Sequence, residues 1–364
     1  MTLPWNRATV TQLFRHFTIG AAYVIGLMAL MTATLLILRI PPIPALQAIW
    51  IGAVGDSTTG TLAPLSTTLT KMAPLLLTGL GVTIAWRAGM FSIGAEGQLL
   101  IGALAALGLA TLTPRIPAPI LILMMLMIGA LAGSLWSGLA GWLRIYRNVP
   151  EVISTIMLNY IALNIIGAMV TEPGPLHGKT QAGPHSDPIP DALNLPNLIP
   201  PVQHGIQVHL HLGIAIAIAV VPLVALYLYR TRSGFGIRVV GQNAEAAAVA
   251  RMPIDRLRLE AMLVSGGLCG LAGAIELMGV TGRLGRDFSA GWGYTAIPVA
   301  LLGSLSPFGV LGSAVFFGAL AAGCNNAQRS AGVPSVVAYI IQATAVLAIV
   351  THRAWRQRAG AEPE

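Results

Sequence analysis

The sequence predicts an all-α integral membrane protein with about ten transmembrane helices, and three observations support this. Of its 364 residues, 55% are apolar and only 9% are charged, whereas an ordinary soluble domain carries about 25% charged residues. The mean hydropathy is +0.75. Apolar runs of about 20 residues, the length that crosses a bilayer, recur along the chain. So few polar residues cannot cover a water-soluble globule of this size, which excludes a soluble multidomain enzyme.

The apolar runs set the boundaries of the expected spans. Clear runs occupy residues 17–38, 66–86, 93–113, 118–143, 151–171, 210–230 and 259–280. Shorter or glycine-interrupted runs follow at 293–304, 309–325 and 333–351. The spacing of Gly266, Gly270 and Gly273 indicates close helix packing within one of these runs. An even number of spans places both termini on the same side of the membrane.

The basic residues indicate which side that is. Two thirds of the 21 Lys and Arg residues fall on the side of the termini, and the remaining third comprises Arg39, Lys71, Arg115, Lys179, Arg283, Arg286 and Arg329. By the positive-inside rule both termini are then cytoplasmic, and the net charge of +8 does not imply a nucleic-acid partner. We expect a cytoplasmic segment at 1–16, a transmembrane domain at 17–351 and a cytoplasmic tail at 352–364.

Two hydrophilic loops interrupt the spans. The outer loop 172–209 is rich in proline and is expected to be solvated without secondary structure. The inner loop 231–258 is rich in arginine and contains a short predicted helix, Asn243 to Met252. Asn243 is a good N-cap and Pro253 ends the helical pattern.

No catalytic, cofactor-binding or metal-binding set is predicted. Gly178-Lys179-Thr180 lacks the earlier glycine of a phosphate-binding loop, because Pro173 occupies that position. His204, His209 and His211 have a spacing that could hold a metal, but a solvated loop explains them more simply. Cys269 and Cys324 lie inside apolar runs and are interpreted as buried small side chains.

Polar residues at membrane depth are costly and are therefore candidates for function. Glu96 is expected near the start of a helix, either as a functional carboxylate or as a charge at the cytoplasmic interface. Glu276 is expected to pair with Arg283 and Arg286. The remaining candidates are amides that either join helices or line a watery path: Asn159, Asn164, Asn325 and Asn326.

Residues 89–106, GMFSIGAEGQLLIGALAA, resemble the signature stretch of the permease subunits of ABC importers in the ribose, branched-chain amino acid and nucleoside group. The similarity is greatest to the general nucleoside, or BMP-dependent, branch, and residues 73–89, 236–252 and 293–320 extend it. Ser92 stands where the family usually has Asn, and Arg251-Met252 where it has Gly-Ile. The signature positions are Gly89, Ile93, Gly94, Glu96, Gly97 and Gln98.

The resemblance implies a permease of the bacterial inner membrane that imports nucleosides and binds no cofactor itself. Its partners would be ABC ATPase subunits that use the ATP, a second, related but different permease chain, a periplasmic or lipoprotein substrate-binding protein and membrane lipid, without nucleic acid. A cytoplasmic coupling helix would contact the ATPase. By resemblance that segment consists of Gly241, Gln242, Asn243, Ala244, Glu245, Ala246, Ala247, Ala248, Val249, Ala250, Arg251 and Met252.

Three alternatives remain open at this point. The same importer class could carry simple sugars or branched-chain amino acids. A secondary transporter of the inverted-repeat type is a different class, and a weak similarity between residues 89–104 and 291–305 would fit it or reflect composition alone. A membrane-embedded enzyme is a third class, without supporting residues.

Overall fold

The computed structural model describes residues 40–56, 62–113, 115–179, 183–199 and 210–334, together with the strand residues 202–203 and 206–207 and scattered positions at 26–37, 340 and 343. The chain divides into two compact units, 57–319 and a smaller one formed by 1–56 with 320–364. The predicted spans 17–38 and 333–351 and the terminal segments 1–16 and 352–364 lie largely or wholly outside the described residues.

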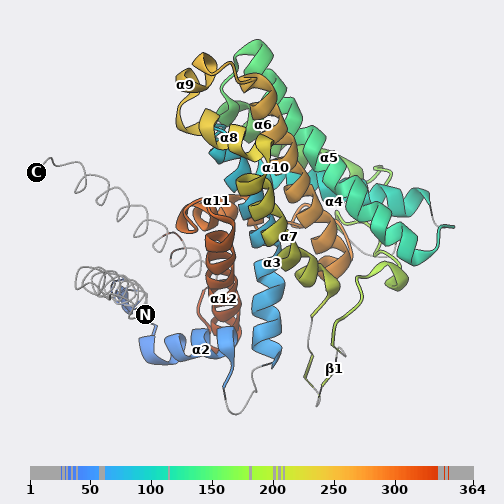
Figure 1. The fold of residues 1–364 in the computed structure, drawn as a ribbon. Coiled ribbons are helices and arrows are strands. Elements are labelled where there is room, and N and C mark those ends of the chain that lie inside the picture. Colours follow the sequence, from blue (N-terminus) through green and yellow to red (C-terminus); the bar gives the residue numbers. More distant parts are fainter. Residues whose placement is uncertain are drawn as a thin grey trace, which may run out of the picture. The chain divides into compact units, whose positions relative to one another are not determined.

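Long apolar helices dominate the structure (Figure 1). Within the described residues, seven helices are long and apolar enough to cross a membrane, which confirms a mostly helical membrane protein, although the expected total of about ten is not reached there. They are α3 (Leu62–Arg87), α4 (Ala95–Leu112), α5 (Ala118–Arg147), α6 (Glu151–Val170), α7 (Leu212–Arg230), α10 (Ile254–Glu276, continued by the π-helical segment η2, Leu277–Thr281) and α12 (Pro307–Ala331).

The remaining elements are short. They are α2 (Pro42–Val54), η1 (Asp191–Leu193), the antiparallel strands β1 (Val202–Gln203) and β2 (Ile206–Gln207), α8 (Arg232–Gln242), α9 (Ala244–Val249) and α11 (Trp292–Leu302). The predicted span 293–304 is α11, whose 11 residues extend only about 16 Å. A bilayer core is about 30 Å thick, so α11 covers about half of it.

Glycines allow α10 to lie directly against two neighbouring helices. A Cβ on Gly266 would lie 2.2 Å from the carbonyl oxygen of Gly133 on α5, and one on Gly270 would lie 2.2 Å from that of Gly129. A Cβ on Gly273 would meet the backbone of Leu99 on α4. The predicted small-residue packing is confirmed, because any larger residue would force these backbones apart.

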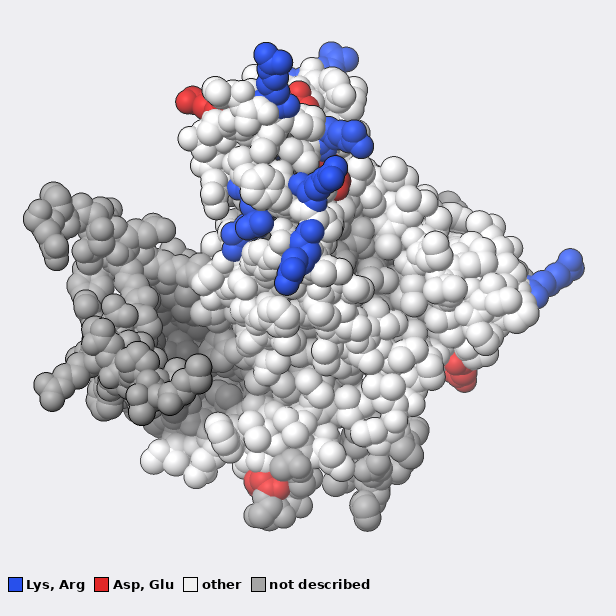
Figure 2. Space-filling model, in the orientation of Figure 1, with Lys and Arg blue, Asp and Glu red and all other residues white. Residues whose placement is uncertain are grey.

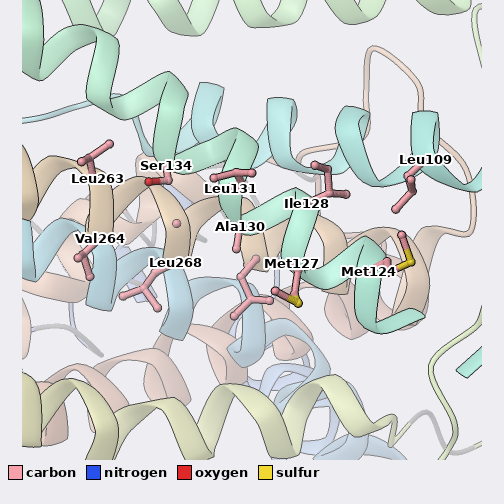
Figure 3. A pocket seen from close by; sticks show the side chains of 12 residues that line it. Leu109, Met124, Met127, Ile128, Ala130, Leu131, Ser134, Leu263, Val264 and Leu268 are labelled. Atoms are coloured by element: carbon pink, nitrogen blue, oxygen red, sulfur yellow. The ribbon is translucent and has the colours of Figure 1, made fainter. Parts of the chain in front are cut away.

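An apolar groove of about 770 Å³ lies between α5 and α10. In Figure 3, Leu263, Val264 and Leu268 from α10 lie toward one end of the groove, and Met124 from α5 lies beside Leu109 of α4 at the other. Ser134 is the one lining residue with a polar side chain. Since α5 is among the least buried of the seven candidate spans, the groove suits contact with hydrocarbon rather than with a polar solute.

The proline-rich loop 172–209 differs from its prediction, because its described part is ordered by backbone hydrogen bonds to the chain after α10. Ser186 N–H donates to the Leu284 carbonyl at 2.8 Å, Ile189 N–H to that of Gly282 at 2.8 Å and Leu195 N–H to that of Met278 at 2.9 Å. The side chains of Ile189, Leu193 and Leu195 are buried. Burial of these apolar residues is the stabilising contribution that a composition-based prediction missed.

In the smaller unit, α2 packs against the second half of α12 through Ala45, Ala48, Leu320, Cys324 and Ala327. Cys324 is buried there, and Cys269 is buried on α10, as predicted. Asn326 donates from Nδ2 to the Ala48 carbonyl at 2.8 Å. This amide therefore joins two helices of the smaller unit.

Candidate functional site

The signature stretch is tied to one face of α6 by three side chains spaced four residues apart. Glu151 Oε1 accepts from Phe91 N–H at 3.3 Å, and Thr155 Oγ1 accepts from Ile93 N–H at 3.2 Å. Asn159 Oδ1 accepts from Gly97 N–H at 2.8 Å. Residues four apart lie on one face of a helix, so α6 supplies a row of acceptors to the non-helical residues Phe91 and Ile93 and to the first turn of α4.

Asn159 is the centre of this network. It is 3% exposed, and its Nδ2 donates to the Ile93 carbonyl at 2.9 Å and to the Tyr294 hydroxyl at 3.4 Å. A Cβ on Gly97 would lie 2.8 Å from Asn159 Oδ1, so only glycine lets α4 approach α6 this closely. Both polar atoms of Asn159 are used in joining α4, α6 and α11.

The first turns of α4 and α11 meet end to end. Glu96, the second residue of α4, is 7% exposed, and its Oε2 accepts from Gly293 N–H of α11 at 2.8 Å. Ser289 and the backbone of Tyr294 also hydrogen-bond to this carboxylate. A Cβ on Gly293 would lie 2.2 Å from the backbone nitrogen of Glu96. Glu96 thus lies at the start of a helix, as expected, and it is buried against α11.

Electrostatics explain the buried carboxylate. The N-terminus of a helix carries the equivalent of about half a positive charge, so two N-termini in contact repel each other. The Glu96 carboxylate lies between the two N-termini, and a negative charge there interacts favourably with both of them. We name the set of Glu96, Asn159, Gly97, Gly293 and Tyr294 the junction.

The junction lies near the midpoint of α6, which is one of the candidate membrane spans. Asn159 is eight residues along this helix, about 12 Å from its start. From the junction α11 returns to the end of α3, where Arg87 Nε donates to the Leu305 carbonyl at 2.9 Å. Interrupted helices that begin near mid-membrane are typical of solute sites in transporters.

Two tyrosines in this region escaped the sequence analysis, and they lie near the predicted candidate Asn164. Tyr294 is 45% exposed and Tyr160 58% exposed. Asn164, one turn beyond Tyr160, is also exposed and donates from Nδ2 to the Tyr160 carbonyl at 2.8 Å. A tyrosine at the centre of an apolar span is unusual, because tyrosines concentrate at the membrane surface, and that pattern was the available signal.

Lys71 lies within α3, inside the predicted span 66–86, and its Nζ lies 5.5 Å from the centre of the Trp292 ring. Lys71 interacts electrostatically with Glu276 on α10, whose expected partners Arg283 and Arg286 lie beyond the helix. Arg286 instead lies against Gly167 of α6. Helix packing between α3 and α10 outweighed proximity in the sequence.

The inner loop forms two helices where one was predicted. α8 ends at Gln242, and Asn243 caps α9 by accepting Ala246 N–H on Oδ1 at 2.9 Å, as expected. α9 ends at Val249, three residues before the predicted end at Met252. Arg251 adopts a positive φ of 55°, and the N–H groups of Arg251 and Met252 return to the carbonyls of Ala248 and Ala247 at 2.9 and 3.0 Å. This is a Schellman turn, and it ends α9 before the chain reaches Pro253, the residue that was predicted to end the helix.

Most of the surface of α9 is exposed. Ala247 is fully buried, whereas Val249 is 86% exposed and Glu245, Ala246, Ala248 and Ala250 are also exposed. Figure 2 shows lysine and arginine residues gathered at this end of the molecule. The arginines of the loop are Arg232, Arg238, Arg251, Arg256 and Arg258.

The inner loop contacts the signature stretch directly. A Cβ on Gly241, next to the end of α8, would lie 2.0 Å from the Arg87 carbonyl oxygen and 3.0 Å from the Gly89 nitrogen. Gly89 has a positive φ of 72° and begins the turn that leads to the junction.

The other predicted amides, Asn325 and Asn326, lie on the part of α12 that belongs to the smaller unit.

Comparison with known proteins identifies the family. Residues 65–350 match the family described as the branched-chain amino acid transport system permease component. The glucose ABC transporter permease protein TsgB13 of Haloferax volcanii is 33% identical over 92% of this chain and 86% of its own length. The guanosine ABC transporter permease protein NupP of Bacillus subtilis is 33% identical over 85% of this chain and 86% of its own length.

A third relative, the nucleoside ABC transporter permease protein NupB of Lactococcus lactis subsp. cremoris, is 29% identical over 85% of this chain and 83% of its own length. No solved structure matches the chain significantly. The family and the relatives are transport components, and the chain has the apolar helices of a multi-pass membrane protein. The chain therefore belongs to the branched-chain amino acid transport system permease family, as a membrane subunit of an ABC transporter and not an enzyme.

Proposed function

We propose that this chain is the permease subunit of a binding-protein-dependent ABC importer for nucleosides. The observation that carries the substrate class is the similarity to the guanosine and nucleoside permeases over 85% of the chain. A second candidate is a simple sugar, because the glucose permease is as similar as the guanosine permease.

The partners follow from the proposed assembly. ABC ATPase subunits use the ATP, a related but different permease chain completes the membrane part, and a periplasmic or lipoprotein binding protein delivers the solute. The permease itself contributes no cofactor site, no metal site and no surface for nucleic acid. The assembly resides in the bacterial inner membrane, in contact with lipid.

The proposed topology has ten spans within residues 17–351, with segment 1–16, loop 231–258 and tail 352–364 in the cytoplasm and loop 172–209 outside. The concentration of arginine around α9 supports this orientation. Cysteines at the exposed positions Asp191 and Glu245, in a background without Cys269 and Cys324, are expected to react with an impermeant reagent from opposite sides. Reaction from the same side would contradict the topology.

We propose that segment 241–252 contacts the ATPase through the exposed face of α9. Movement of α9 would then reach Arg87 and Gly89 through Gly241, and the junction through residues 91–97, which are hydrogen-bonded to α6. On this proposal Asn159 positions the helices around the solute path and Asn164 lines it. Asn325 remains a predicted lining residue, as does Asn326, although the Asn326 amide also joins α2 to α12.

The decisive experiment is uptake by the reconstituted assembly of both permeases, ATPase and binding protein. Labelled guanosine is expected to enter vesicles only with ATP and with the binding protein, whereas glucose is expected not to enter. Glucose uptake without guanosine uptake would replace the first candidate by the second. Uptake driven by a proton or sodium gradient without ATP would contradict the importer class.

A further inference from the structure

Tyr160 presents its side chain outward at the centre of a membrane span. It is the tenth of the 20 residues of α6 and is 58% exposed. A phenolic hydroxyl that faced lipid tails there would lose its hydrogen bonds to water, and tyrosines that face lipid lie at the membrane surface instead. This surface of α6 therefore suits a polar surrounding rather than hydrocarbon.

Tyr294 lies beside Tyr160 and is held in place by the junction. Its hydroxyl accepts from Asn159 Nδ2 at 3.4 Å, Asn159 precedes Tyr160 on α6, and the two tyrosines are close enough to interact electrostatically. Gly293 and Glu96 fix the backbone of the preceding residue. The ring of Tyr294 is thus oriented by its hydroxyl and its backbone while nearly half of the residue stays exposed.

The two tyrosines come from different segments, and the exposed amide of Asn164 lies one turn farther along α6 than Tyr160. Aromatic faces beside an amide and two hydroxyls suit a planar ring that carries hydrogen-bonding groups. Stacking of a base on an aromatic side chain contributes about 1–3 kcal/mol and tolerates different bases.

We propose that Tyr160 and Tyr294 form the surface on which the base of a nucleoside stacks at mid-membrane, with Asn164 as the neighbouring polar group. This inference rests on the proposed function, and it assigns to the permease a contact with the solute itself. The stacking is weak compared with capture by a binding protein, so the solute can leave the surface toward the cytoplasm.

The test uses the full reconstituted assembly with saturating, guanosine-loaded binding protein, so that capture outside the membrane does not limit the rate. Tyr160→Leu and Tyr294→Leu are each expected to lower the guanosine import rate about tenfold. Tyr160→Phe retains the aromatic face and is expected to stay within about twofold of the wild type. The matched control is Ile161→Leu, an exposed neighbour on α6, which is expected to leave import unchanged.

A second measurement does not depend on how well the leucine variants insert. In a chain without Cys269 and Cys324, Tyr160→Cys is expected to react with a water-soluble methanethiosulfonate, and guanosine delivered by the binding protein is expected to slow that reaction at least threefold. Leu131→Cys, on the exposed apolar face of α5, is expected to react far more slowly.

The outcomes separate this inference from the proposed function. Guanosine import by the wild type that is insensitive to both leucine variants would overturn the stacking surface and leave the proposed function intact. No reaction of Tyr160→Cys with the water-soluble reagent would also overturn it, since lipid or the second permease would then cover this face. A wild-type assembly that imports glucose and no guanosine would overturn both.

Discussion

The junction and α9 share one sequence feature, a glutamate in the first turn of a helix, but the surroundings of the two glutamates differ. Both α4 and α9 carry a glutamate as their second residue, Glu96 and Glu245, where the helix dipole favours a negative charge. Glu96 is buried and accepts from the first turn of another helix, whereas Glu245 is exposed. The same feature thus joins two helices at the junction, whereas at α9 it stabilises the end of a single exposed helix.

The surroundings explain why the two regions are built differently. A backbone group without a partner in hydrocarbon costs several kcal/mol, so the non-helical segment 91–94 needs the side chains of α6 as acceptors. At α9, water can satisfy the free groups, and a single capping side chain suffices. The buried region is therefore rigid and specific, and the exposed one is free to meet a partner.

The largest expected effect comes from breaking the junction at its closest approach. In Gly293→Ala the new Cβ would lie 2.2 Å from the Glu96 nitrogen and 2.4 Å from its Cα, and neither backbone atom can move alone. Uptake is expected to fall to background. Gly312→Ala, with nothing within 4 Å of its Cβ, is the control and should transport normally. Normal uptake by Gly293→Ala would mean that α4 and α11 do not meet as described.

A smaller effect is expected from removing the charge while keeping the shape. Glu96→Gln can still accept from Gly293 N–H but no longer offsets two helix N-termini, an interaction of about 1–2 kcal/mol when partly buried. Thermal unfolding in detergent should occur at a lower temperature, and uptake should fall several-fold. Glu245→Gln makes the same change at the same helix position, in the exposed region, and should cost at most about 0.5 kcal/mol. Equal effects of the two substitutions would contradict the comparison.

Local features of these two regions could be predicted from the sequence. The cap of α9 was predictable because asparagine is a preferred N-cap residue and a run of helix-forming alanines follows Asn243. The apolar runs that correspond to α3 to α7 were recognised from their length. The end of α9 was missed, since its Schellman turn places Arg251 where glycine is usual.

The junction itself could not be predicted. Glu96 and Gly293 are separated by 197 positions, and no helical or strand periodicity links them. The partners of Lys71 could not be predicted for the same reason, because its packing near Glu276 and Trp292 depends on how α3 meets α10 and α11. The sequence did show that 89–104 and 291–305 are both glycine-rich helix starts. It could not show that these two segments contact each other, because that contact depends on the fold.

Removing the cap of α9 tests the exposed region with a milder perturbation. Asn243→Ala loses the acceptor for Ala246 N–H, at a cost of about 1 kcal/mol. A helix of six residues has little other stability, so stimulation of ATP hydrolysis by loaded binding protein should fall several-fold while insertion stays normal. Asn243→Asp preserves the cap and should behave as the wild type. Full stimulation in the alanine variant would argue against α9 as the ATPase contact.

The smallest effect, and the only stabilising one, is expected at the end of the same helix. Arg251 holds a φ of 55°, which costs a residue with a Cβ about 1 kcal/mol, and glycine adopts it freely. Arg251→Gly should therefore slow amide hydrogen exchange in α9 a few-fold and leave stimulation of ATP hydrolysis intact. Gly282→Ala makes the reverse change at a φ of 64° with nothing within 4 Å of the added Cβ, and it should lose a similar amount of stability. If Arg251→Gly stabilised α9 but weakened the stimulation, the Arg251 guanidinium would itself bind the ATPase, and the exposed region would act through a specific side chain as the junction does.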